Sequence, residues 1–175
     1  MLQGCWEEAA NYLLKGNALH KSAGLASQLI RAKLDEAELL AHQGRIDAGL
    51  PLIAEALADS QELAEIRSPA LRQRAELLAQ SAAEAPAVEV AYRAAIECAR
   101  AQGAKYYELQ AMTSFARWLK SQRRATEAYD LLAEIYNWFT EGFDTVALRE
   151  AKALLENMRD ESGTPRRSSI RRKGR

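Results

Sequence analysis

An internal repeat is the feature of this sequence that most limits its fold. Residues 43–57 (QGRIDAGLPLIAEAL) align without a gap on residues 122–136 (QRRATEAYDLLAEIY). Gly49 meets Ala128 in this alignment, so small residues fall at matching places. Units of about 40 residues that recur in this way hold two helices and two turns, and each unit needs a neighbour to bury its apolar face. The sequence therefore predicts an array of helical hairpins.

Two weaker copies extend the array. A third copy lies between the first two, with Leu78 in the place of Leu40 and Tyr92 in the place of Leu50. A partial fourth copy, GCWEEAANYLL, occupies residues 4–14. Because the partial copy begins at the turn, we expect it to supply a second helix with no first helix before it.

The composition favours helices along the whole chain. Ala, Leu, Glu, Gln and Arg dominate, and the 175 residues include only four prolines and nine glycines. The dominant residues are strong helix formers, whereas the β-branched residues that favour strands are sparse. We therefore predict an all-α fold. First helices are expected at 25–42, 69–80 and 105–121, and second helices at 5–16, 47–62, 86–101 and 125–139.

Local signals predict some of the helix ends. Ser68-Pro69 is typical of a helix start, with serine as the N-cap and proline in the first turn. Gly103 suits the C-terminal cap of the helix before it. We expect Pro51 in the first turn of its helix, where no intrahelical N–H bond is lost.

Paired helices are expected to pack closely because each supplies a small residue at the contact. The small positions are Ala37, Ala75 and Ala116 on first helices and Ala9, Gly49, Ala91 and Ala128 on second helices. The bulky positions around them are Leu40, Leu78 and Leu119 on first helices and Leu50, Tyr92 and Tyr129 on second helices. Burial of one such bulky side chain stabilises the fold by roughly 1.5–3 kcal/mol.

The stretch AHQGRIDAGLPLIAEAL (41–57) resembles the tetratricopeptide repeat over its whole length. It has the Gln-Gly pair, the acidic turn and the small residue early in the second helix that typify that family. The resemblance implies an α-hairpin solenoid, here of about three and a half repeats with a C-terminal capping helix.

A second resemblance covers residues 116–156, and its most specific parts are YNWFTEGFDT (136–145) and REAKALLE (149–156). These segments resemble the C-terminal end of large bacterial regulators, in which a nucleotide cyclase or a helix-turn-helix DNA-binding domain precedes a signal-transduction ATPase domain and a repeat array. The resemblance implies a non-catalytic protein–protein interaction or regulatory module of bacterial signal transduction. Its partner would be a protein or peptide, including neighbouring domains of a larger protein. The ATPase and cyclase signatures are absent from this sequence, so neither activity is carried over.

The expected organisation is one tetratricopeptide-like helical domain (1–159) followed by a disordered basic tail (160–175). Its parts are a partial first repeat (4–24), repeats at 25–66, 67–103 and 104–143, and a capping helix (145–159). In the capping helix Thr145 is the expected N-cap. Its apolar face is formed by Leu148, Ala151, Leu155 and Met158, and its water-facing side by Arg149, Glu150, Lys152, Glu156 and Asn157.

The N-terminal helix leaves an apolar face open. This face is formed by Trp6, Ala9, Ala10 and Leu13. An unpaired stripe of this kind indicates an interaction site, a homodimer seam or a truncation. The chain is therefore interpreted as a fragment of a larger regulator, a degraded gene product or a free-standing adaptor.

No group of residues suggests catalysis, a metal or a cofactor. The two cysteines, Cys5 and Cys98, match no metal or redox spacing. The two histidines, His20 and His42, are expected on solvent-facing surfaces. Residues 16–24 (GNALHKSAG) lack the glycine that a phosphate loop places before Lys-Ser. We therefore predict a protein that is not an enzyme, has no cofactor and no membrane-spanning segment, and is cytoplasmic.

The family resemblance implies a binding groove lined by exposed residues of the first helices. Mapped by repeat position, the groove residues are Arg31, Glu38, Arg72, Glu76, Gln110, Thr113, Arg117 and Lys120. The basic residues at the end of this row favour an acidic peptide as ligand. The alternative interpretation is an ordinary solvated surface.

Charge is unevenly distributed along the chain. Basic and acidic residues number 24 each, but six basic residues lie in the last ten positions, which leaves residues 1–165 with 18 basic residues against 24 acidic ones. The acidic body argues against binding of a phosphate backbone, so nucleic acid is an unlikely partner for the repeats. The basic tail supports an alternative function, a nucleic-acid-associated factor that binds through residues 166–175.

Overall fold

The fold is all-α over the part of the chain that the computed structural model describes, residues 12, 15, 26–60 and 63–161. Seven helices lie in these ranges, and the same ranges contain no strand. They are α2 (Ala26–His42), α3 (Ile46–Asp59), α4 (Ala64–Gln80), α5 (Ala85–Ala101), α6 (Lys105–Ser121), α7 (Ala125–Tyr136) and α8 (Val146–Glu161).

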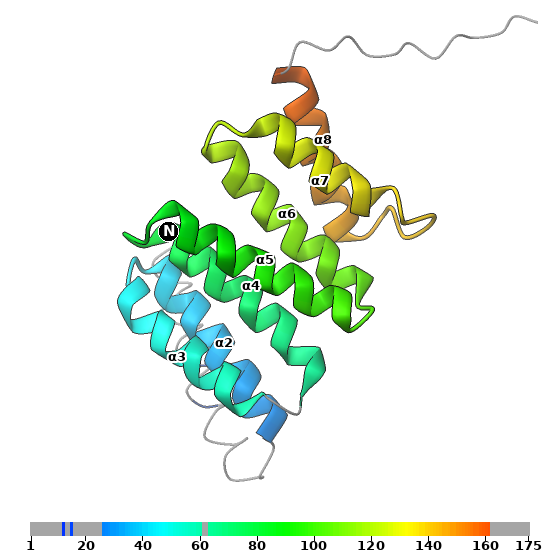
Figure 1. Ribbon diagram of the computed structural model, residues 1–175. Coiled ribbons are helices and arrows are strands. Elements are labelled where there is room, and N and C mark those ends of the chain that lie inside the picture. The colour runs from blue at the N-terminus through cyan, green and yellow to red at the C-terminus, as the bar shows by residue number, and fades with distance from the viewer. Residues whose placement is uncertain (1–11, 13–14, 16–25, 61–62, 162–175) are drawn as a thin grey trace, which may run out of the picture.

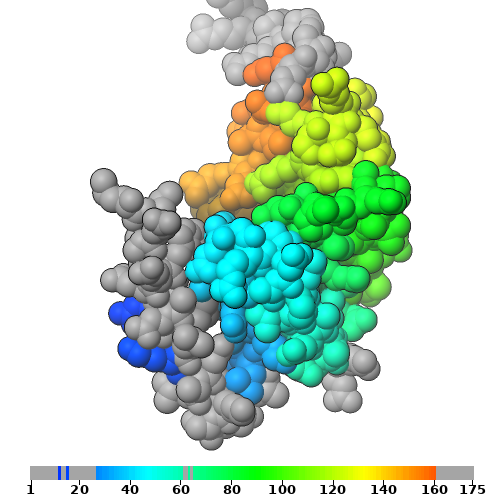
Figure 2. Space-filling model, turned by 90° about the vertical axis from the view of Figure 1, so that its left-hand side faces the viewer, coloured from blue at the N-terminus to red at the C-terminus, as the bar shows by residue number. Residues whose placement is uncertain are grey.

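The helices stack in chain order from α2 and α3 at one end to α8 at the other (Figures 1 and 2). Each helix packs against the next one in sequence. The even-numbered helices also pack on one another, α2 against α4, α4 against α6 and α6 against α8. One side of the molecule is therefore built from α2, α4, α6 and α8.

Most predicted helices agree with the structure to within a few residues, but the start of α4 was predicted wrongly. The predicted N-cap Ser68 and its neighbour Pro69 lie inside α4, which begins at Ala64. Ser68 is buried, and its hydroxyl donates a hydrogen bond to the carbonyl of Ala95 in α5 at 3.3 Å. The residue therefore links two helices instead of starting one. The repeat boundary predicted after residue 66 consequently falls within α4.

Pro51 also lies deeper in its helix than predicted. It is the sixth residue of α3, just as Pro69 is the sixth residue of α4. A proline there cannot donate to the carbonyl four residues earlier, that of Asp47. Both Pro51 and Asp47 are exposed, so water can donate a hydrogen bond to the Asp47 carbonyl, which proline cannot do.

Three of the connections between helices have the same turn. Each ends with a residue at positive φ, namely Gly44 (75°), Gly103 (63°) and Arg123 (62°). In each turn the next residue donates its N–H to the carbonyl five positions earlier, as Arg124 does to Leu119 at 3.0 Å. This is the Schellman arrangement, so the predicted cap at Gly103 is confirmed. Arg123 adopts the same left-handed backbone conformation, although its Cβ makes that conformation unfavourable.

The predicted small positions lie in the core. Ala37, Ala75, Ala116 and Ala128 are fully buried, and Gly49 and Ala91 are buried as well. At Gly49 the approach is so close that an added Cβ would lie 2.8 Å from Leu77 Cδ2 and 3.1 Å from the Ala37 carbonyl oxygen. The close contact predicted between α2 and α3 is confirmed.

The C-terminal helix has the predicted faces. Leu148, Ala151 and Met158 are buried in the same core cluster as α5, α6 and α7, and Leu155 packs against it. The observed helix runs from Val146 to Glu161, so it extends two residues beyond the predicted 145–159 and into the predicted tail. The Thr145 carbonyl accepts the first helical hydrogen bond, from Arg149, as expected of an N-cap residue.

Several predictions lie outside the described residues. These are the helix at 5–16, the partial repeat at 4–24, the open face formed by Trp6, Ala9, Ala10 and Leu13, and the basic residues of the tail. They stay predictions, as does a homodimer through the N-terminal helix.

An ion network on the odd-numbered helices joins α5 to α7. Arg124 contacts Glu89 at 2.6 Å and Glu127 at 2.8 Å, and Arg93 contacts Glu89 at 2.7 Å. Hydrogen bonds from Arg124 and then from Arg93 lower the pKa of Glu89 to about 2. The folded state therefore favours the charged form of Glu89 over the protonated form.

The shared turn predicts opposite effects at two matched positions. Arg123→Gly should stabilise the protein by about 0.5–1 kcal/mol, because glycine adopts the left-handed conformation without a Cβ penalty. Gly103→Ala should destabilise it by about 1 kcal/mol, because alanine adopts the positive φ of this position with difficulty. An added Cβ would meet no atom within 4 Å, so steric clash with neighbours adds nothing to this cost. Urea unfolding measures both changes. A destabilised Arg123→Gly variant would contradict this account of the turn.

The Glu89 network predicts a pH-dependent stability. Because the pKa of Glu89 falls on folding, its contribution is complete above its ordinary value of 4.5 and is lost as the pH falls towards about 2. Glu89→Gln should therefore cost about 1 kcal/mol at neutral pH, a small value because solvent screens a partly exposed pair. The difference from the unchanged protein should shrink in unfolding experiments between pH 5 and about 3. The matched Glu97→Gln variant, on an exposed part of the same helix, should leave stability nearly unchanged.

Candidate binding groove

Two hollows lie between the even-numbered helices. The first, between α4, α6 and α8, has a volume of about 120 Å³ and is lined by Arg72, Tyr106, Gln110, Thr113, Ser114, Arg117, Val146, Ala147 and Glu150. The second, between α4 and α6, has a volume of about 260 Å³ and is lined by Glu76, Ala79, Gln80, Tyr92, Ser114, Arg117 and Trp118. Because the hollows share Ser114 and Arg117, they form one groove, which we call the α4–α6–α8 groove.

The floor of the second hollow is aromatic. Tyr92 and Trp118 are buried below it, with ring centroids 6.1 Å apart. Phe115 stacks on both of these rings, at 5.4 Å from Tyr92 and 6.0 Å from Trp118. Burial is the main reason that the pKa of Tyr92 is raised well above its ordinary value, so its hydroxyl stays protonated. The rings are uncharged and expose little area, 3% of Tyr92 and 8% of Trp118, so they support this part of the groove mainly from below.

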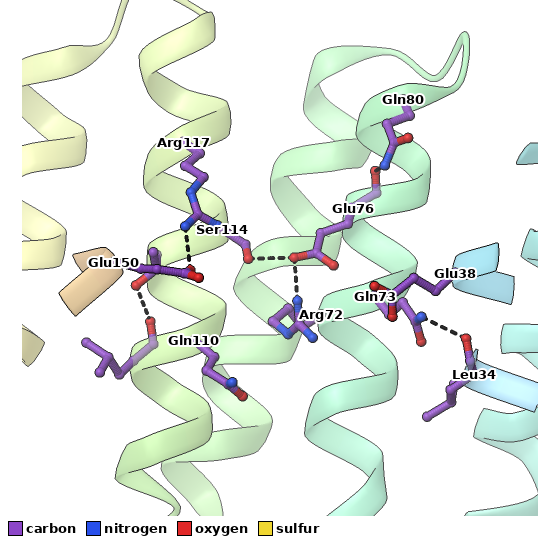
Figure 3. Close-up of polar contacts among 12 residues, drawn as sticks. Leu34, Glu38, Arg72, Gln73, Glu76, Gln80, Gln110, Ser114, Arg117 and Glu150 are labelled. Atoms are coloured by element: carbon purple, nitrogen blue, oxygen red, sulfur yellow. Dashed lines mark hydrogen bonds and ion pairs between the residues drawn. The ribbon is translucent and has the colours of Figure 1, made fainter. Parts of the chain in front are cut away.

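A row of polar contacts crosses the groove from helix to helix (Figure 3). The Arg72 guanidinium contacts Glu76 at 2.5 Å, and the Ser114 hydroxyl donates to the same carboxylate oxygen of Glu76 at 2.6 Å. The Arg117 guanidinium contacts Glu150 of α8 at 2.7 Å. Each arginine of the groove is thus paired with a carboxylate. The local charge of the groove sums to zero.

One donor in the groove has no acceptor. The Nε–H of Arg72 is buried and makes no hydrogen bond, although the guanidinium Nη1 is paired with Glu76. Among the side chains that the structure describes, this is the single buried polar atom without a partner. A buried unsatisfied donor costs roughly 1–3 kcal/mol.

The structure brings together most of the groove residues that the sequence predicted. Arg72, Gln110, Thr113 and Arg117 line the first hollow, and Glu76 lines the second. The remaining three, Arg31, Glu38 and Lys120, line neither hollow. Figure 3 shows Glu38 on the α2 side of the same face.

Two features of the predicted groove were wrong. Thr113 was expected to be exposed, but it is 4% exposed and its hydroxyl donates to the Leu109 carbonyl of its own helix. The expected basic patch is also not free, because Arg117 is paired with Glu150 and Lys120 donates to Asn157 of α8. Helix α8, which packs against α6, thus compensates the charge of Arg117 and accepts a hydrogen bond from Lys120.

Four lining residues were not predicted as groove residues, namely Tyr106, Ser114, Val146 and Glu150. Helical periodicity correctly placed Glu150 on the exposed side of α8, but it does not tell which helix that side faces. Ser114 directly follows Thr113. It would have been predicted if the groove position on α6 had been placed one residue later in the sequence. The two exposed apolar residues, Tyr106 and Val146, carry no periodic signal because they lie at the ends of their helices.

A third hollow, of about 310 Å³, lies on the other side of the molecule near Trp138. Of its four charged lining residues Glu108 is almost fully buried, and it contacts Arg100 at 2.7 Å and Lys105 at 2.8 Å. Burial alone would raise the pKa of Glu108, but hydrogen bonds from Arg100 and Lys105 outweigh it and hold the pKa below its ordinary value. Lys105 also lies 5.7 Å from the centre of the Trp138 ring. Since these groups satisfy one another, we interpret the cluster as a structural link.

The aromatic and sulfur-containing side chains differ in exposure. Trp118 is buried in the core, whereas Trp138 is 57% exposed and Tyr106 is 49% exposed. His42 is exposed near Glu38, at 3.8 Å, as predicted for a solvent-facing histidine. Cys98 is partly buried and accepts a hydrogen bond from Gln102, and burial raises the pKa of its thiol.

Other classes of site receive no support from the described residues. Within them no group of three or more His, Cys, Asp or Glu side chains could hold a metal ion. None of the described helices combines the length and the apolar character that a membrane crossing requires.

No protein-family model matches the chain, and no curated protein matches it with significance.

Proposed function

We propose that the chain is a non-catalytic protein-interaction module, a tetratricopeptide-like array that binds a peptide segment of another protein in the α4–α6–α8 groove. The observation that carries this proposal is the pair of connected hollows, which is formed by three helices that are neighbours in space and not in sequence. A groove of this kind suits an extended chain, because the ligand can cross several helices in turn.

The contacts between even-numbered helices support the solenoid interpretation. Hairpins that stack with one helix of each pair on a common side produce such contacts, and the identical turns after α2, α5 and α6 repeat the same local geometry. The small residues at Ala37, Ala75 and Ala116 recur at the spacing that the sequence repeat predicts.

The resemblance of residues 116–156 to the end of bacterial signalling ATPases suggests a regulatory use of the groove. In that setting the bound segment belongs to a neighbouring domain or to a separate regulator, and binding restrains or releases an activity located elsewhere. The chemistry of the groove fits this role, because its ion pairs are internally satisfied and leave hydrogen bonding and apolar contact to select the ligand.

A blocking substitution tests the groove directly. Random linear peptides displayed on phage are selected for binding to the whole chain. The affinity of the enriched peptides is then measured for the unchanged protein and for the Gln110→Trp variant. Gln110 is half-buried and lines the first hollow, so an indole there should fill the space and reduce affinity by at least about tenfold. Circular dichroism should show an unchanged helical content.

The matched control is Glu97→Trp, which adds the same ring on an exposed position of α5 away from the groove. It should leave the affinity unchanged. Failure to enrich any peptide would overturn the proposed function. Enriched peptides that bind both variants equally would mean that the chain binds peptides at another surface.

A further inference from the structure

We propose that the α4–α6–α8 groove selects an uncharged extended peptide segment, with an apolar side chain in the second hollow and a neutral hydrogen-bond acceptor beside Arg72 in the first. The inference rests on the proposed function and names the ligand chemistry of that site. It departs from the acidic ligand that the sequence favours.

The charge balance of the groove argues against an acidic ligand. A carboxylate that approaches Arg117 must compete with Glu150, already 2.7 Å away, and one that approaches Arg72 must compete with Glu76 at 2.5 Å. Each arginine–glutamate pair has no net charge. A ligand carboxylate in this space would therefore lie close to the carboxylates of Glu76 and Glu150 without a free cation to bind. Like charges placed close together are unfavourable, and no unpaired cation in the lining offsets that cost.

The unsatisfied Nε–H of Arg72 indicates what the first hollow lacks. It is a donor, it is buried, and its guanidinium is already charge-compensated by Glu76. The Nε–H is covered in the free protein, but the Arg72 side chain is 27% exposed, so a rotation of this side chain brings the donor to a ligand acceptor. A main-chain carbonyl or an Asn or Gln side chain supplies an acceptor without adding charge. The side-chain amide of Gln110, in the same lining, offers both a donor and an acceptor to a peptide main chain.

The second hollow calls for an apolar side chain. Its floor consists of Tyr92 and Trp118, supported by Phe115, and its rim includes Ala79. At about 260 Å³ it has room for one large side chain, which would be covered on one side only, so its contribution is less than the roughly 1.5–3 kcal/mol of full burial. Leucine, methionine or phenylalanine suits such a site.

The arrangement of the helices sets the spacing between the two ligand groups. Both hollows adjoin α4 and α6, and the second lies farther along these helices, beside Glu76 and Gln80 where the first lies beside Arg72, so their centres are separated by roughly 6–12 Å at a helical rise of about 1.5 Å per residue. An extended chain covers about 3.3–3.6 Å per residue. The apolar residue and the neutral acceptor should therefore lie about three residues apart.

The test uses random linear peptides displayed on phage and selected against the whole chain. Enriched peptides should carry a large apolar residue about three positions from Asn, Gln or another uncharged residue, and should not be enriched in Asp or Glu. The affinity of an enriched synthetic peptide should change by less than about twofold between low and physiological salt, since no ion pair forms on binding. Enrichment of acidic peptides with steep salt dependence would overturn the inference and leave the proposed function standing.

A conservative variant isolates the Arg72 donor. Arg72→Lys keeps the positive charge beside Glu76 but removes the Nε–H. It should reduce the affinity for the enriched peptide by about three- to tenfold. The matched control Arg74→Lys makes the same change at an exposed position of α4 and should have no effect. Glu150→Gln should change affinity for the uncharged peptide by less than about twofold, whereas an acidic ligand would bind it more tightly.

An unchanged affinity in Arg72→Lys would overturn the role assigned to the donor. If Arg72→Lys lost helical content, Gln110→Ala would replace it, because this truncation at a half-buried site also removes a hydrogen-bonding group from the first hollow. Its expected effect is a decrease of about threefold for the uncharged peptide. No decrease in a folded Gln110→Ala variant would overturn the neutral-acceptor subsite.

Discussion

The close approach of helices at small residues is the constraint on which the structure depends. At Gly49 the backbone of α3 comes so near α2 that a Cβ would lie 3.1 Å from the Ala37 carbonyl oxygen. Ala75, Ala91, Ala116 and Ala128 of the later helices are all buried, as expected of small residues at helix contacts. Because consecutive helices pack closely, each even-numbered helix also contacts the next even-numbered helix, as α2 contacts α4 and α4 contacts α6. Without those second-neighbour contacts there would be no common side and no groove.

The sequence predicted this framework well because repetition and helical periodicity are local properties. It placed α6 at its observed bounds and identified the small positions and the apolar face of α8. It failed at the start of α4, where Ser68-Pro69 has the local pattern of a helix start. Ser68 lies inside the helix because its hydroxyl reaches Ala95 of the next helix, a contact between distant positions. A proline within a helix is tolerated at an exposed turn, and no local pattern distinguishes that case from a true start.

The groove could be predicted only in outline for the same reason. Repeat position identified Arg72, Gln110 and Arg117, because equivalent positions of stacked helices face the same side. It could not identify their partners, since those lie on other helices. Arg117 is a free cation when α6 is considered alone and half of an ion pair once Glu150 of α8 is in place. The expectation of an acidic ligand came from counting charges on one helix, and the paired structure reverses it.

Helix α8 consequently combines two roles that are usually considered separately. Its apolar face packs on the core through Leu148, Ala151 and Met158. Its other residues Val146, Ala147 and Glu150 line the first hollow. The side chain that neutralises Arg117 therefore belongs to a helix whose buried face is separate from Glu150. A change of one exposed residue on α8 would convert the groove from neutral to basic while the packing of the helix stays the same.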